Sequence, residues 1–102
     1  MKLLNLVVDE YITIVEHLLE TYPVENNRII IDRETFKILL EKYTYLKFKQ
    51  KTKIYKQLKF IIHDKNNYTM PYKNKELNKT IRQVIINFEA YNIMKYLNET
   101  KT

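Results

Sequence analysis

Hydrophobic residues recur in steps of three and four along both ends of the chain. The first run covers residues 3–22, with apolar positions at Leu4, Val7, Val8, Tyr11, Val15, Leu18, Leu19 and Tyr22. The last run covers residues 75–97, with apolar positions at Leu77, Ile81, Val84, Ile85, Phe88, Tyr91, Met94 and Leu97. This spacing is typical of amphipathic helices. We therefore predict a first helix that ends before Pro23 and a long last helix.

The segment after the first helix predicts a turn, a short strand and a second helix. Asn26 and Asn27 favour a turn, because asparagine tolerates positive φ and the chain has no glycine. The β-branched residues 28–31 predict a strand. Asp32 then has the character of a helix N-cap, and the helix that it begins is expected to run to about Tyr43.

Apolar spacing returns in the middle of the chain and predicts a third helix from about Lys49 to Ile62. Lysine side chains at positions 49, 53 and 56 share one face of this helix, with Lys59 beside them. Residues 63–67 form a turn cluster. A small hairpin across Asn66 and Asn67 is expected to contain a short strand at residues 68–70, which Pro71 ends.

The predicted order is helix, strand, helix, helix, hairpin, helix, which indicates a mainly α protein with a small β component. A helix-turn-helix pair preceded by a strand and followed by a hairpin is the layout of a winged helix-turn-helix domain. We expect one such domain over residues 1–98 and a frayed tail over residues 99–102. A plain four-helix bundle is the competing architecture.

Charge is strongly polarised along the chain, whose overall net charge is +6. Residues 1–41 carry a net charge of −4, residues 42–82 carry +10, and residues 83–102 are neutral. Codon bias toward lysine would spread the positive charge evenly, whereas this distribution produces a directed field that attracts polyanions. The acidic residues of the first helix, Asp9, Glu10, Glu16 and Glu20, are spaced like an ordinary solvated face.

The residue types that most enzymes need are missing. Serine, cysteine and glycine are absent, so the chain offers no serine or cysteine nucleophile, thiolate metal site or glycine-rich phosphate loop. The two histidines, His17 and His63, have no metal-ligand spacing. We expect a non-enzymatic protein without a cofactor or metal. The chain has no long apolar run, so we expect no membrane-spanning segment, no signal peptide and a cytoplasmic location.

The basic segment indicates binding to nucleic acid with low sequence preference. Lysine acts as a point charge that suits phosphate, and none of the three arginines lies in the third helix. Tyrosines in the predicted turns offer rings on which bases can stack, whereas Phe48 and Tyr55 are expected in the core. The predicted interface comprises Lys47, Lys49, Lys51, Lys53, Lys56, Lys59, Lys65, Lys73, Tyr45, Tyr68 and Tyr72.

Three features together resemble a known family: the acidic first helix, the segment RIIIDRETFKILLEKY and the basic segment KFKQKTKIYKQLKFII. They are similar to the small winged-helix single-stranded-DNA-binding proteins that cassette-type mobile elements of Gram-positive bacteria encode. The resemblance implies binding of single-stranded DNA through the winged-helix surface, during replication of the element. It directs attention to the lysines of the third helix and to Lys65 and Lys73 of the hairpin.

Two other functions stay open at this stage. A duplex-DNA-binding regulator would have the same fold, and the long first and last helices could supply the interface of a homodimer. Alternatively, the chain could be an interaction or inhibitor subunit of a replication enzyme. Its acidic first helix would then contact a helicase, polymerase or primase.

Overall fold

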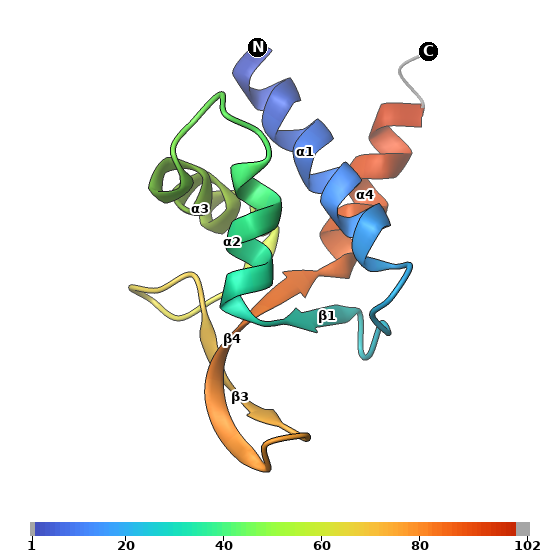
Figure 1. Cartoon of the computed structure of the whole chain (residues 1–102). Coiled ribbons are helices and arrows are strands. Elements are labelled where there is room, and N and C mark those ends of the chain that lie inside the picture. The colour runs from blue at the N-terminus through green and yellow to red at the C-terminus, as the bar shows by residue number, and fades with distance from the viewer. Residues whose placement is uncertain (1, 100–102) are drawn as a thin grey trace.

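The computed structural model describes residues 2–99, and within this range the chain forms four helices and a small antiparallel sheet (Figure 1). In chain order the elements are α1 (Lys2–Leu18), β1 (Arg28–Ile31), α2 (Arg33–Glu41), α3 (Phe48–Gln57), β2 (Ile61–Ile62), β3 (Met70–Asn74), β4 (Lys79–Asn87) and α4 (Phe88–Glu99). This mixed α/β arrangement is compatible with the predicted mainly α class with a small β component. The alternative of a plain four-helix bundle is wrong, because a sheet joins the helices.

The sheet is organised around β4, which pairs antiparallel with the other three strands. Its inner half, residues 84–87, pairs with β1, and residues 85–86 also pair with β2. Its outer half, residues 79–83, pairs with β3. The β3–β4 hairpin projects from the body of the molecule, away from the four helices (Figure 1).

Alternation along the inner strands separates a core face from a helix-free face. Ile29 and Ile31 pair with Ile86 and Val84, and these four side chains belong to the hydrophobic core. Aromatic rings complete this core, since the ring of Tyr11 stacks on that of Phe60 with 3.8 Å between centroids. Ile30 and Ile85, which also pair, point to the opposite face because neighbouring strand residues alternate.

Local signals around the first strand are confirmed. Asn26 and Asn27 adopt φ of 52° and 60° in the turn before β1. The Asp32 carboxylate accepts hydrogen bonds from the backbone N–H of Thr35 at 2.9 Å and from its hydroxyl at 2.7 Å, so it caps α2. Burial disfavours ionisation of Asp32, but these bonds outweigh it and hold the pKa of the carboxyl below its usual value. Helix α1 ends at Leu18, a turn earlier than expected.

Two further predicted helices are shorter than expected. The helix predicted over residues 75–97 is wrong for residues 75–87, where the chain forms a turn and β4 instead. The steps between apolar residues fit a helix, but the high content of β-branched residues in 80–86 favours a strand. The third helix ends at Gln57, because Lys59 adopts φ of 63°, which breaks the helix and leads the chain into β2.

The hairpin predicted across Asn66 and Asn67 is wrong, and a hairpin forms between β3 and β4 instead. Asn66 and Asn67 lie in a loop over residues 63–69, and the hairpin turn lies between Asn74 and Lys79. The turn uses Asn78, at φ of 52°, and the Asn74 side chain accepts a hydrogen bond from the backbone of Leu77 at 2.9 Å.

Pro71 also behaves differently, since it lies within β3 instead of ending the strand. Strand β3 pairs only with β4, and proline is tolerated in a strand that needs no hydrogen bond on its other edge. Of the predicted frayed tail at 99–102, Glu99 is the last residue of α4, and residues 100–102 lie outside the described range.

Candidate nucleic-acid interface

Helix α3 presents a lysine face to solvent. Each residue of an α-helix rotates the chain by about 100°, so Lys49, Lys53 and Lys56 lie within about 60° of one another. Lys49 and Lys53 are exposed and Lys56 is half-buried. Lys47, the exposed N-cap residue, has its backbone N–H bonded to the Gln50 side chain at 3.1 Å. These four lysines are therefore exposed or half-buried, and their contact with nucleic acid stays a prediction.

Lys51 does not belong to this face, and its predicted contact with nucleic acid is wrong. Its helical position is about 140–160° from the other three lysines, and its side chain is 1% exposed. The Lys51 ammonium lies 2.7 Å from the Glu10 carboxylate and donates to the backbone oxygens of Leu40, at 2.6 Å, and Tyr43. With these three acceptors, Lys51 joins α1, the end of α2 and α3 inside the protein.

Glu10 is the buried partner, so its assignment to a solvated face is also wrong. One Glu10 oxygen bonds to Lys51, and the other accepts a hydrogen bond from the Tyr55 hydroxyl at 2.7 Å. Burial, together with the negative charge of Glu10, raises the pKa of Tyr55 well above its ordinary value. The phenol therefore remains protonated and acts as a donor. A buried ion pair with its remaining polar atoms satisfied is the form that proteins tolerate.

The remaining predicted lysines are exposed. Lys59 follows α3, Lys65 lies in the 63–69 loop and Lys73 lies on β3. The structure adds two exposed lysines that the sequence analysis did not single out, Lys75 and Lys79, which flank the hairpin turn. The sequence held one signal for these two lysines, the β-branched residues after Lys79. Such residues favour a strand, and a strand at that place would have put both lysines at the tip of a hairpin.

The three predicted tyrosines have different environments. Tyr68 is half-buried, and its ring stacks on Phe36 and contacts the edge of Phe48, with 5.8 Å and 5.4 Å between centroids. The Tyr45 ring lies 4.6 Å from the Lys51 ammonium, and its hydroxyl is enclosed. These two rings are therefore engaged in the packing of the protein itself. Tyr72 is half-buried on β3 and, among the described residues, makes no ring contact. Tyr55, by contrast, is a core residue as expected.

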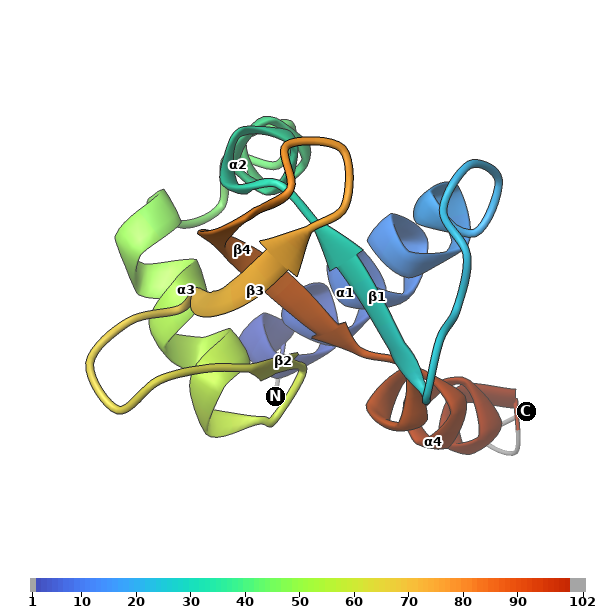
Figure 2. The same cartoon turned by 90° about the horizontal axis from the view of Figure 1, so that it is seen from below.

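Most of the unpaired lysines belong to three segments that lie on the side of the molecule away from α4. Helix α3, the 63–69 loop and the β3–β4 hairpin lie away from α4 in both overall views (Figures 1 and 2). In the 42–82 segment, only Lys51 and Arg82 form an ion pair with a carboxylate within residues 2–99. Arg82 bonds to Asp64 and to both oxygens of Thr69, and thereby anchors the loop to β4. The other ten lysines of this segment form no ion pair with a carboxylate of residues 2–99.

On the side of the molecule that carries α4, an acidic side chain of α1 is engaged in contacts within the protein. The Glu16 carboxylate of α1 accepts hydrogen bonds from Lys95 and from the Tyr91 hydroxyl of α4, the latter at 3.0 Å. The bond from Lys95, followed by that from Tyr91, lowers the pKa of Glu16. This contact joins the first and last helices.

Other kinds of site find little support in the described part of the chain. Among residues 2–99, no three histidine, aspartate or glutamate side chains gather into a set that could hold a metal ion. None of the helices in that range has the length and apolar character needed to cross a membrane. A comparison with known protein families and with curated protein sequences found no match to this chain.

Proposed function

We propose that this protein is a non-enzymatic binding module for single-stranded DNA, with low sequence preference, that acts in the replication of a mobile element. The observation that carries the proposal is the lysine face of α3, where Lys49, Lys53 and Lys56 stand together without carboxylate partners among the described residues. Unpaired, aligned ammonium groups repel one another and are neutralised by a polyphosphate backbone.

The order of elements supports a winged helix-turn-helix for this purpose. Helices α2 and α3 follow a short strand, and the β3–β4 hairpin follows them in the place of a wing. In this interpretation α3 and the hairpin form one binding surface, with Lys73, Lys75 and Lys79 on the hairpin as additional phosphate contacts.

The absence of arginine from α3 supports low specificity. The exposed side chains of α3 are Lys49 and Lys53, which suit phosphate, together with Gln50 and Gln57. Arg82 of β4 is already bonded to Asp64 and Thr69. Arginine pairs with guanine through a free planar guanidinium, and α3 offers none. Backbone contacts without base contacts position a strand but do not read its sequence.

Fluorescence anisotropy with a labelled oligothymidine and a labelled random duplex, at several salt concentrations, tests the proposal. If about five lysines contact phosphate, log affinity for the single strand falls against log salt with a slope of about −3.5. The double variant Lys49→Glu/Lys53→Glu should lose most of this affinity. A matched control, Arg33→Glu/Lys37→Glu, changes the net charge equally on exposed positions of α2.

The outcomes separate a local site from a general charge effect. If the α3 variant loses binding and the α2 control keeps most of it, the lysine face is the site. Equal losses in the two variants would mean that only net charge matters. Absence of single-strand binding by the unaltered protein at low salt would refute the proposal.

A duplex-binding regulator is the second candidate, and one observation favours it. Leu3, Leu4 and Leu6 of α1 and Ile93 and Tyr96 of α4 are large apolar side chains that are 44–67% exposed. Exposed apolar surface of this kind marks interfaces, and regulators of duplex DNA commonly bind as dimers. A dimer in analytical ultracentrifugation, together with preference for duplex in the same anisotropy experiment, would support this candidate over the first.

A further inference from the structure

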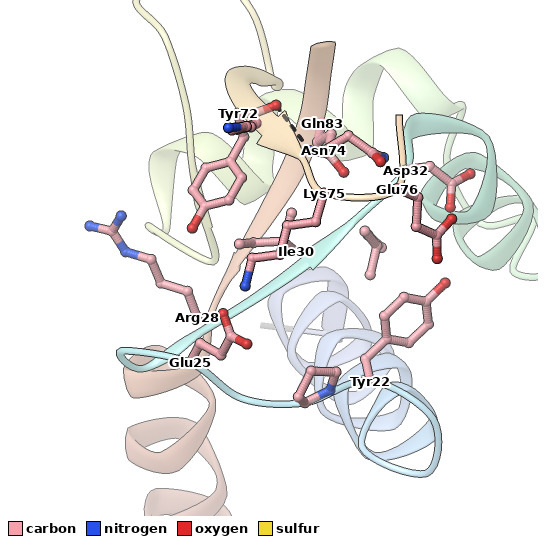
Figure 3. A pocket seen from close by; sticks show the side chains of 13 residues that line it. Tyr22, Glu25, Arg28, Ile30, Asp32, Tyr72, Asn74, Lys75, Glu76 and Gln83 are labelled. Atoms are coloured by element: carbon pink, nitrogen blue, oxygen red, sulfur yellow. Dashed lines mark hydrogen bonds between the residues drawn. The ribbon is translucent and has the colours of Figure 1, made fainter. Parts of the chain in front are cut away.

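A hollow of about 420 Å³ opens on the helix-free face of the sheet, between the β3–β4 hairpin and β1 (Figure 3). This volume lies within the range of small-molecule pockets. The hollow is separate from the lysine face of α3, and of the residues that line it only Tyr72 and Lys73 belong to the predicted interface. Its chemistry therefore needs its own explanation.

Strand alternation builds the floor and one wall of the hollow. Ile29 and Ile31 are buried in the core, so Ile30 between them faces the other side of the sheet and forms the floor. On β3 the half-buried positions alternate with exposed ones, which places Tyr72 on the inner side of the hairpin; the exposed Lys73 also borders the hollow. Gln83 donates to the Tyr72 backbone oxygen at 3.2 Å and stabilises this wall.

Charged side chains of both signs line the hollow. Arg28 lies near Tyr72 with Glu25 beside it, Lys75 lies near Ile30, and Tyr22, Asp32 and Glu76 lie on the far side (Figure 3). Of the acidic groups, the Asp32 carboxylate is already occupied by its hydrogen bonds to Thr35.

Arg28 is available to a ligand. Glu25, near Arg28, exchanges backbone hydrogen bonds with it at 2.9 Å in both directions. Even so, within residues 2–99 the guanidinium of Arg28 forms no ion pair with any carboxylate. One end of the hollow thus combines an aromatic ring, an apolar floor and an unpaired guanidinium.

We infer that this hollow binds one unstacked base of the single strand, with the base against the Tyr72 ring and Ile30 and the adjoining phosphate at Arg28. The inference rests on the proposed function, since it assigns a second contact to the same bound strand. An aromatic ring beside a cation is the combination on which single-stranded nucleic acids stack. Seen from below, β3 lies between α3 and β1, so a strand that leaves α3 reaches the hollow by crossing β3 (Figure 2).

The decisive comparison uses Tyr72→Ala, Tyr72→Phe and Tyr96→Ala, whose affinities for oligothymidine are measured by anisotropy. Stacking on one base changes affinity by about 5- to 150-fold, so Tyr72→Ala should lose affinity within this range. Because no phosphate contact is removed, its salt slope should stay unchanged. Tyr72→Phe should bind like the unaltered protein, and so should Tyr96→Ala, whose ring is exposed on α4. Circular dichroism checks that each variant is folded.

Arg28→Gln provides the complementary test, because it removes a phosphate contact and leaves the ring in place. It should reduce the steepness of the salt slope by about 0.7 for a single strand. The variant Arg33→Gln, on an exposed arginine of α2, serves as its control and should leave the slope unchanged.

The results distinguish this inference from the proposed function. If Lys49→Glu/Lys53→Glu abolishes binding but Tyr72→Ala binds normally, the proposed function stands and the base pocket is refuted. If the unaltered protein binds no single strand, both fail. A titration with thymidine monophosphate, followed by the amide chemical shifts of Ile30 and Gln83, shows whether the hollow binds a free nucleotide or a base of a strand. Saturation at micromolar concentration would indicate a site for a free nucleotide and would overturn the assignment to a strand.

Discussion

Replacing Lys51 with methionine tests the buried ion pair directly. Methionine keeps an unbranched side chain of similar length but removes the ammonium group, which is the donor to Glu10, Leu40 and Tyr43. The Glu10 carboxylate, 2% exposed, would be left with the Tyr55 hydroxyl alone. Breaking a buried pair by removing one partner costs about 3–5 kcal/mol, a large part of the 5–15 kcal/mol by which domains are typically stable.

Urea unfolding followed by far-ultraviolet circular dichroism gives the free energy of unfolding. Lys51→Met should lower it by about 3–5 kcal/mol, whereas Lys53→Met, two positions along on the exposed face, should change it by less than about 0.5 kcal/mol. The double variant Glu10→Leu/Lys51→Met removes both charges and should recover much of the loss. This recovery keeps the prediction measurable even if Lys51→Met does not fold.

Binding measurements complete the comparison, because the two lysines have opposite roles. Lys53→Met should weaken single-strand binding and make the salt slope less steep, by about 0.7. The folded double variant Glu10→Leu/Lys51→Met should retain the original slope. If Lys51→Met were as stable as Lys53→Met, the reasoning about the buried network would be refuted.

Two further predictions concern stability alone. Lys59→Gly should raise the free energy of unfolding by about 1 kcal/mol in the same urea assay. The reason is that glycine adopts the observed φ of 63° without the steric cost of a Cβ atom. A lower free energy of unfolding would contradict this account of how α3 ends. The bonds from Lys95 and Tyr91 lower the pKa of Glu16 in the folded protein. They therefore stabilise the fold at pH values above the pKa of about 4.5 that Glu16 has in the unfolded chain. This stabilisation is lost as the pH falls through the lower pKa of Glu16 in the folded protein. The stability difference between the unaltered protein and Glu16→Gln should therefore be larger at pH 7 than at pH 3, and a difference independent of pH would contradict the assignment.

Signals that depend on a few neighbouring residues were readable from the sequence. The Asp32 cap, the Asn26–Asn27 turn and the β-branched first strand need only local chemistry, and all three are confirmed. The position of the lysine face on α3 also followed from helical periodicity. These features do not depend on which distant segment packs against them.

Features set by distant contacts were not readable in the same way. In a run of lysines, Lys51 is chemically identical to its neighbours, and only its partner Glu10, 41 positions away, makes it a core residue. Its helical phase, shared with Tyr55, was the available hint. Similarly, β4 has apolar spacing that also fits a helix, and pairing with β1, β2 and β3 decides in favour of a strand.

The continuity of β4 has a consequence for how the protein moves. Strand β4 runs from the projecting hairpin into the core and ends at Asn87. The Asn87 side chain donates a hydrogen bond to the Lys59 backbone oxygen at 2.8 Å, and the Asn87 backbone N–H donates one to the Phe60 backbone oxygen at 2.9 Å. The outer half of β4, residues 79–83, pairs with β3 alone, whereas residues 85–86 of the inner half pair with both β1 and β2. Backbone amides should accordingly exchange with deuterium fastest at the turn and slowest near Ile86. Because Asn87 at the end of β4 is bonded to Lys59 and Phe60, a movement of the β3–β4 hairpin would displace the end of α3 as well.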